Sequence, residues 1–207
     1  MVAPLYSRTD KSVHDGLLIE TFAPGEYVAS PWGPKMQHGG PVAALLARAM
    51  DRCEPRPGTR LARFGVEILG AVPLAEVRVS ARVVRPGRRI ELLNAALEAH
   101  DANGRWRPVA IGTAWRLATH TTEDVVNVAD HAKTQPGENS RNLHDHVMPD
   151  SWRVGGFVAA LTWRMDHIGT TATDHTTAWI NLSHPLVDGE DITPLERVIA
   201  VAGSSPG

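Results

Sequence analysis

Apolar residues recur along the chain at two different spacings, and each spacing predicts an element. Between Pro41 and Cys53 they return at helical period, which is typical of an amphipathic helix. The apolar side of that helix carries Val42, Leu45, Leu46, Ala49, Met50 and Cys53. Alanines occupy the neighbouring flank, so we expect another element to pack closely there as well.

Strict alternation takes over after the helix. Between Glu76 and Val84, apolar and polar residues alternate, as they do in a strand that is buried on one face. The predicted strands are Gly16–Phe22, Arg63–Leu69, Glu76–Val84, Ile90–Ala99 and Trp106–Leu117. Pro86-Gly87 and Asp101–Gly104 supply the turns between the last three. The predicted order is therefore a strand, a helix and then an antiparallel meander.

The second half of the chain repeats only the opening of this order. Residues 118–150 are polar and aperiodic, which indicates a linker or an exposed excursion. Gly156–His167 and Thr176–Leu182 have strand-like patterns, and a second helix begins at Pro194. Its apolar stripe consists of Leu195, Val198, Ile199 and Ala202. No meander follows to cover that stripe, so we expect either a longer polypeptide or self-association through this surface.

Composition narrows the possible functions. Hydrophobic residues make up 43% of the 207 residues and charged residues 21%, as in a soluble globular protein. A formal net charge of -2 gives no sign of a nucleic-acid or anionic-membrane partner. No apolar run is long enough to span a bilayer, and the first residues do not form a secretory signal. Because Cys53 is the single cysteine, no internal disulfide can form, and we expect a cytoplasmic protein.

Three stretches together resemble one known family. They are HGGPVAALLARAM at residues 38–50, ARVVRPGRRIELLNAAL at residues 81–97 and TTAWINLSHPLVDGEDITPLERVIAVAG at residues 176–203. In combination they are similar to the thioesterase-like superfamily, in particular to the double-hotdog relatives of type II acyl-CoA thioesterases. The resemblance covers residues 16–117 and 155–207.

The resemblance implies an α+β hotdog fold, in which a curved antiparallel sheet wraps a long central helix. Residues 1–117 are then the first hotdog module, residues 118–150 a polar linker or excursion, and residues 151–207 the start of a second module that is incomplete in this chain. The resemblance also implies hydrolysis of an acyl-CoA or acyl-carrier-protein thioester, without a cofactor, by a homo-oligomer.

In this family the thioester carbonyl lies at the N-terminus of the first helix, here beside His38, Gly39 and Gly40. Elementary helix chemistry agrees, because first-turn N–H groups lack intrahelical acceptors and the helix dipole adds partial positive charge. Two glycines leave room for a ligand, and Pro41 removes only a donor that has no partner in any case. The same residues are also common before helices that bind nothing, where the histidine would only cap the helix N-terminus.

Further candidates for substrate binding are Trp32, Arg88 and Arg89. The last two belong to a group of arginines between Arg78 and Arg89. That group either forms a solvated face or binds the phosphates of coenzyme A, since a guanidinium matches phosphate geometry.

The general base is missing from its expected position. In the family an aspartate just after the second helix orients the attacking water, and Gly203 stands there instead. Glycine cannot activate water. The alternative function is therefore a non-catalytic module that binds an acyl thioester. In that case hydrolysis is slow, and Gly203→Asp is expected to raise it.

Two other patterns are weaker. Gly203–Gly207 fits Gly-x-Ser-x-Gly, but a nucleophile elbow needs a strand before it, and here a helix precedes it. His144 and His146 offer two imidazoles, but no further ligands follow at a familiar spacing, so no metal is predicted.

Overall fold

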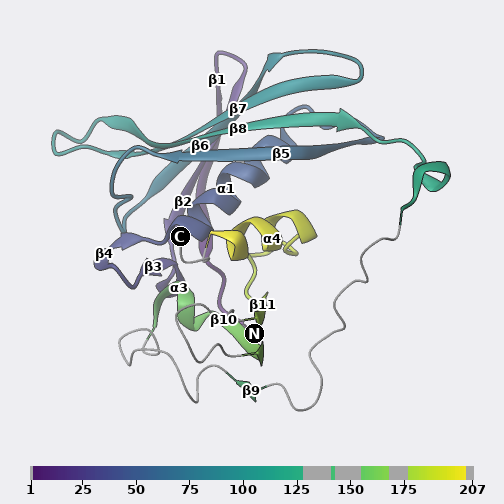
Figure 1. The fold of residues 1–207 in the computed structure, drawn as a ribbon. Coiled ribbons are helices and arrows are strands. Elements are labelled where there is room, and N and C mark those ends of the chain that lie inside the picture. The colour runs from purple at the N-terminus through teal and green to yellow at the C-terminus, as the bar shows by residue number, and fades with distance from the viewer. Residues whose placement is uncertain (1, 128–140, 143–154, 168–176, 204–207) are drawn as a thin grey trace.

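One antiparallel sheet and one long helix dominate the fold (Figure 1). The computed structural model describes residues 2–127, 141–142, 155–167 and 177–203. Six strands form the sheet, in the order β1-β2-β6-β7-β8-β5. Their bounds are Tyr6–His14 (β1), Leu17–Pro24 (β2), Thr59–Ile68 (β5), Val77–Arg85 (β6), Ile90–His100 (β7) and Trp106–Ala118 (β8). Helix α1, Gly39–Arg52, lies against the inner face of this sheet, as predicted.

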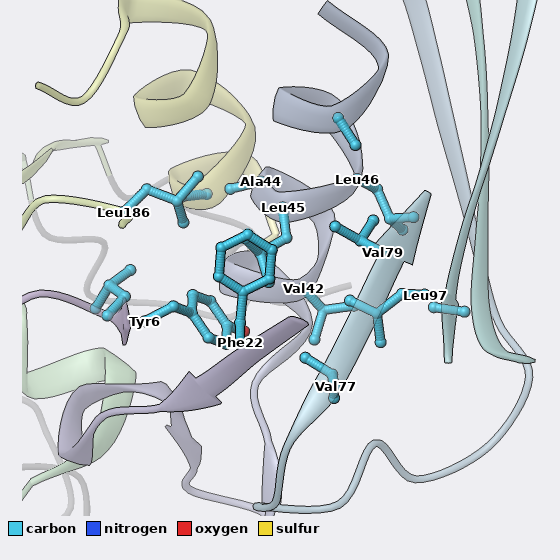
Figure 2. Close-up of a cluster of buried hydrophobic side chains, with 14 of the residues drawn as sticks. Tyr6, Phe22, Val42, Ala44, Leu45, Leu46, Val77, Val79, Leu97 and Leu186 are labelled. Atoms are coloured by element: carbon cyan, nitrogen blue, oxygen red, sulfur yellow. The ribbon is translucent and has the colours of Figure 1, made fainter. Parts of the chain in front are cut away.

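Alternation across the strands builds the core on the inner face. In β7 every second residue from Glu91 to Ala99 is buried. Helix α1 is buried continuously from Gly40 to Met50, which is more than a helix covered on one side requires. Figure 2 shows the reason: Leu46 lies on the side of the sheet, whereas Ala44 lies on the other side, near Leu186. The flank of α1 that carries the alanines is therefore covered by another element too, as the sequence predicted.

The element on that flank is helix α4, Pro194–Ala202. It begins with a capping box, in which Glu196 N–H donates to Thr193 Oγ1 at 3.2 Å and Thr193 N–H donates to Glu196 Oε2 at 2.9 Å. The buried side of α4 is small and polar, with Glu196 3% and Ala200 0% exposed. Val198, in the predicted apolar stripe, is 64% exposed. Ala202 is exposed as well, whereas Leu195 and Ile199 are half-buried, so the described part of the chain covers the predicted stripe only in part.

A second sheet of three strands lies beyond α4, in the order β11-β10-β9 (Figure 1). Its strands are Arg141–Asn142 (β9), Leu161–His167 (β10) and Thr177–Leu182 (β11). The predicted strand Gly156–His167 is wrong in its first part, because Gly156–Ala159 form a short helix, α3. Gly155 and Gly156 have φ angles of 118° and 70°, which glycine adopts readily. Strand β9 pairs with β10, so the segment predicted as a linker contributes to this sheet.

Short elements connect these layers. They are the 3-10 helices Glu26–Val28 (η1) and Glu123–Val125 (η2) and the two-stranded hairpin of β3, Ala29–Ser30, and β4, Gly33–Gln37. Strand β4 leads directly into α1. Within the described residues, no helix is both long enough and apolar enough to cross a membrane.

An arginine in the middle of α1 joins the two halves of the fold. Arg48 is 1% exposed; its Nη1 donates to Glu20 Oε2 at 2.7 Å and its Nε to Glu190 Oε2 at 2.9 Å. Arg8 Nη1 lies 2.8 Å from Glu20 and 3.2 Å from Glu190, and Arg52 Nη1 lies 2.9 Å from Glu190. This Arg48 cluster, of Arg8, Glu20, Arg48, Arg52 and Glu190, connects β1, β2 and α1 to the segment just before α4. It therefore holds α4 in position.

The Arg48 cluster predicts that acid destabilises the protein. Burial raises the pKa of Glu20 and Glu190, but the hydrogen bonds and charge of Arg48 outweigh it, and each pKa lies below the ordinary value of 4.5. A carboxylate with a lowered folded-state pKa stabilises the fold above its unfolded-state pKa, and that contribution is lost as the pH falls through the folded-state pKa. We therefore expect the free energy of unfolding in urea to decline once the pH drops below 4.5. Glu20→Gln should flatten the decline, while Glu26→Gln, at an exposed position, should not; identical slopes would contradict the prediction.

Candidate functional site

The approach to α1 is anchored at two consecutive residues. Tyr6 Oη–H donates to Gln37 Oε1 at 2.7 Å, and Gln37 Nε2 donates to the carbonyl of Pro73 at 2.8 Å. The backbone N–H of His38 donates to the carbonyl of Val28 at 2.7 Å. His38 therefore enters the helix from a backbone that is fixed on both sides.

His38 caps α1 with its own ring. Its backbone is extended, with φ -72° and ψ 145°, and its Nδ1 accepts the N–H of Gly40 at 3.0 Å. Pro41 has no N–H, so Gly39 and Gly40 supply the amide donors of the first three helical positions. His38 uses the second of these donors. Gly39 is exposed, and no acceptor for its N–H lies among the residues that the structure describes.

Burial keeps the His38 ring neutral. The side chain is 7% exposed, and desolvation lowers its pKa below the usual value. Because Nδ1 accepts a hydrogen bond, the ring proton is assigned to Nε2, which makes Nε2–H a donor. One face of the ring packs on Phe157 of α3, with the ring centroids 5.0 Å apart. Gly39 N–H is therefore a donor at the positive end of the α1 dipole, and His38 carries a second donor, Nε2–H, across the ring from the Nδ1 that accepts from Gly40.

The last turn of α4 lies directly against the first turn of α1. A Cβ at Gly40 would overlap the carbonyl oxygen of Ala200, and a Cβ at Gly203 would lie 2.7 Å from Gly40 Cα. Gly203 has φ -68° and ψ -3°, an ordinary right-handed conformation, so space and not backbone strain limits this position. An aspartate at position 203 has to push the end of α4 away from α1. This steric cost opposes the gain in hydrolysis expected from Gly203→Asp, which stays a prediction.

The other predicted binding residues lie elsewhere. Trp32 is 74% exposed in the turn between β3 and β4, where its backbone N–H donates to Ser30 Oγ at 3.2 Å. Arg88 and Arg89 are exposed in the turn between β6 and β7. Arg56, just beyond the C-terminal end of α1, donates to the carbonyl of Gly87 in that turn at 3.0 Å. The structure thus brings His38, the glycines and Gly203 together, but places Arg88 and Arg89 at the opposite end of α1, about 20 Å away at 1.5 Å per residue.

Phe157 is a contact of the site that the sequence did not predict. It sits in the apolar run GFVAAL, which carries no sign of a role beside a histidine. The weaker candidates His144 and His146, and Ser205 of the Gly-x-Ser-x-Gly match, lie outside the described residues. Among the residues that are described, no group of three or more His, Cys, Asp or Glu side chains is arranged to hold a metal ion.

Sequence comparison identifies the domain that contains this site. Residues 28–117, which include His38, Gly39 and Gly40, match the family model of the acyl-CoA thioesterase N-terminal domain. This segment of the chain belongs to the acyl-CoA thioesterase family. None of the curated proteins compared with the chain matches it significantly.

Comparison with solved structures shows a likeness in fold over most of the chain. A protein of unknown function with a hotdog fold from Alicyclobacillus acidocaldarius is 17% identical, with a TM-score of 0.62 over 96% of this chain and 68% of that one. The chain therefore has the α+β hotdog fold that its sequence implied. The BH2602 protein from Bacillus halodurans, solved with CoA, is 20% identical over 54% of this chain and 74% of that one, with a TM-score of 0.43. A thioesterase family protein from Silicibacter pomeroyi is also 20% identical, over 52% of this chain and 80% of that one, with a TM-score of 0.42.

Proposed function

We propose that this protein hydrolyses an acyl thioester of coenzyme A or of an acyl-carrier protein, with the carbonyl held at the N-terminus of α1. The observation that supports this proposal is the Gly39 N–H, an exposed amide with no acceptor among the described residues, beside a neutral histidine. It lies in the segment that matches the acyl-CoA thioesterase family model.

The chemistry follows from where negative charge develops. When water attacks a thioester, the carbonyl oxygen becomes an oxyanion, and donors aimed at that oxygen stabilise the transition state. Gly39 N–H and His38 Nε2–H are the two donors, and the α1 dipole adds partial positive charge at the same point. In the part of the chain that the structure describes, nothing lies within 4 Å of the position a Gly39 Cβ would occupy, so the thioester can approach the backbone closely.

A second candidate function is thioester binding without hydrolysis. The close approach of Gly203 to Gly40 favours it, because no carboxylate fits at position 203 while α4 keeps this contact. In the described part of the chain, no carboxylate makes a hydrogen bond or ion pair with His38. Such a module would hold the acyl thioester and leave its cleavage to another protein.

We also propose that the protein is cytoplasmic and self-associates through the apolar stripe of α4. The 64% exposure of Val198 supports the contact, because exposed apolar stripes mark interfaces. Sedimentation of the wild type and of Val198→Asp tests it: a monomeric wild type, or an unchanged oligomer in the variant, would overturn this assembly.

Thioester hydrolysis and thioester binding must be measured on the same preparation. Release of free CoA from short-, medium- and long-chain acyl-CoA reports turnover, and calorimetry with a non-hydrolysable thioether analogue reports binding. Steady turnover of at least one chain length is the result we expect. Binding without turnover selects the second function, and the absence of both overturns the proposal.

A further inference from the structure

The outer face of the large sheet, turned away from α1, carries an apolar centre between two basic edges. Strand register aligns Arg85, Leu92, Trp115 and Arg63 across β6, β7, β8 and β5, and aligns Ile90, Leu117 and Arg60 in the next row. Their chain neighbours Glu91 and Arg116 are buried on the inner side, so these residues point outward. We call this surface the outer patch; it comprises Arg60, Arg63, Arg82, Arg85, Ile90, Leu92, Trp115 and Leu117.

The charge of the outer patch is not compensated within the described residues. Its four arginines are exposed, and none of them forms an ion pair with a carboxylate in that part of the chain. Several arginines elsewhere do, among them Arg8, Arg78 and Arg105. Arg85 instead lies over the Trp115 ring, 6.0 Å from its centroid. Since the formal net charge of the chain is -2, this positive surface is a local feature.

A hollow of about 370 Å³ adjoins the outer patch and is lined in part by Arg82, Asn94, Ala96 and Thr113. Asn94 Oδ1, from one of these lining residues, is buried and has no hydrogen-bond partner among the described residues. A buried acceptor without a partner is costly. A donor from a side chain that enters the hollow would remove this cost.

The composition of the outer patch discriminates among possible occupants. A second copy of the same face would bring arginines against arginines, so symmetric self-association is unfavourable. A lipid surface needs protruding apolar side chains, whereas Leu92, Trp115 and Leu117 are half-buried between longer arginines. An apolar centre with a polar rim, rich in Trp and Arg, is instead the usual anatomy of a protein–protein interface. Charge complementarity then requires an acidic partner.

We propose that the outer patch docks an acidic protein, and that this partner is the carrier protein that bears the acyl thioester on its flexible arm. The identity of the partner rests on the proposed function. Acidic side chains of the carrier pair with Arg60, Arg63 and Arg85, and an apolar side chain covers Trp115. The patch extends to β5, an edge strand of the sheet, and lies beside the C-terminal end of α1, where Arg116 donates to the carbonyl of Met50. The arm therefore has to pass around the β5 edge and run about 20 Å along α1 to reach Gly39.

The test uses the full chain and a purified holo acyl-carrier protein without an acyl group, so that hydrolysis cannot interfere. Affinity is measured by calorimetry at low and high salt for the wild type, for Arg60→Glu/Arg63→Glu and for the matched control Arg105→Glu/Arg107→Glu. The control changes the charge equally, at exposed positions at the other end of the same sheet. We expect the patch variant to weaken binding by about tenfold or more, the control by about twofold or less, and added salt to weaken wild-type binding.

The outcomes separate the docking proposal from the proposed function. No binding by the wild type, or equal weakening in both double variants, overturns the docking surface, even if acyl-CoA is hydrolysed normally. Binding through the patch by a protein that neither binds nor hydrolyses any acyl thioester overturns the proposed function and leaves the docking surface intact. A melting curve checks each variant, and Arg60→Gln/Arg63→Gln replaces the charge reversal if that variant does not fold.

Discussion

Replacing Arg48 with alanine is expected to lower the free energy of unfolding by about 3–5 kcal/mol, the usual cost of removing one partner from a buried ion pair. Glu20 is 6% exposed, and its Oε2 lies 2.7 Å from Arg48 Nη1. Without the guanidinium, that carboxylate remains buried with only the partly exposed Arg8 to balance it. Chemical denaturation at neutral pH measures the loss.

Two further variants make the Arg48 prediction specific. Arg105→Ala removes a guanidinium that is 77% exposed and lies 3.5 Å from Asp101, and it should cost about 1 kcal/mol or less. Arg48→Met/Glu20→Gln removes both charges and keeps most of the volume, so it should recover part of the loss seen in Arg48→Ala. A loss in Arg48→Ala no larger than that in Arg105→Ala would mean that the cluster does not hold the fold together.

Elements with a clear period could be predicted from the sequence to within a few residues. Strand β7 was predicted as Ile90–Ala99 and spans Ile90–His100; α1 was predicted over Pro41–Cys53 and spans Gly39–Arg52. Both bury a continuous apolar side, so tertiary packing and local pattern favour the same structure. The strands of the meander were predicted for the same reason.

Elements without such a pattern were missed. Strand β1 has the sequence YSRTDKSVH and buries Tyr6 alone, because it is an edge strand with little contact to the core. No alternation therefore marks it in the sequence. Helix α3 was missed for the opposite reason, because its residues are apolar and were predicted as part of a strand. A short apolar run fits a strand as well as one buried helical turn.

The site was predictable in its local part only. The order of His38, Gly39, Gly40 and Pro41 marks a helix N-terminus that lacks side chains at two positions, and this can be read directly from the sequence. The contact of Gly203 with Gly40 cannot, because it depends on how α4 packs against α1. Arg48 is likewise hidden, since its partners are 28 and 142 residues away along the chain.

The last prediction isolates the Gly39 N–H. Proline at position 39 removes that donor, and it is favoured at the first helical position, where its fixed φ suits the helix. The residue before a proline must be extended, and His38 already has φ -72° and ψ 145°. No atom of the described residues lies within 4 Å of the added Cβ, so Gly39→Pro should fold normally. Alanine at the same position adds a Cβ but keeps the N–H, which makes Gly39→Ala the matched control.

If the Gly39 N–H stabilises the oxyanion, Gly39→Pro should lower kcat for acyl-CoA hydrolysis by about 10²–10³-fold, as removal of one oxyanion donor usually does. Gly39→Ala should retain most of the activity, because its amide still points at the ligand. In the non-hydrolytic case, the same pair of variants is compared by affinity for the thioether analogue, and only Gly39→Pro should weaken it. Equal losses in both variants would show that the ligand needs the space beside the glycine and not its amide. Two unaffected variants would place the thioester away from the N-terminus of α1.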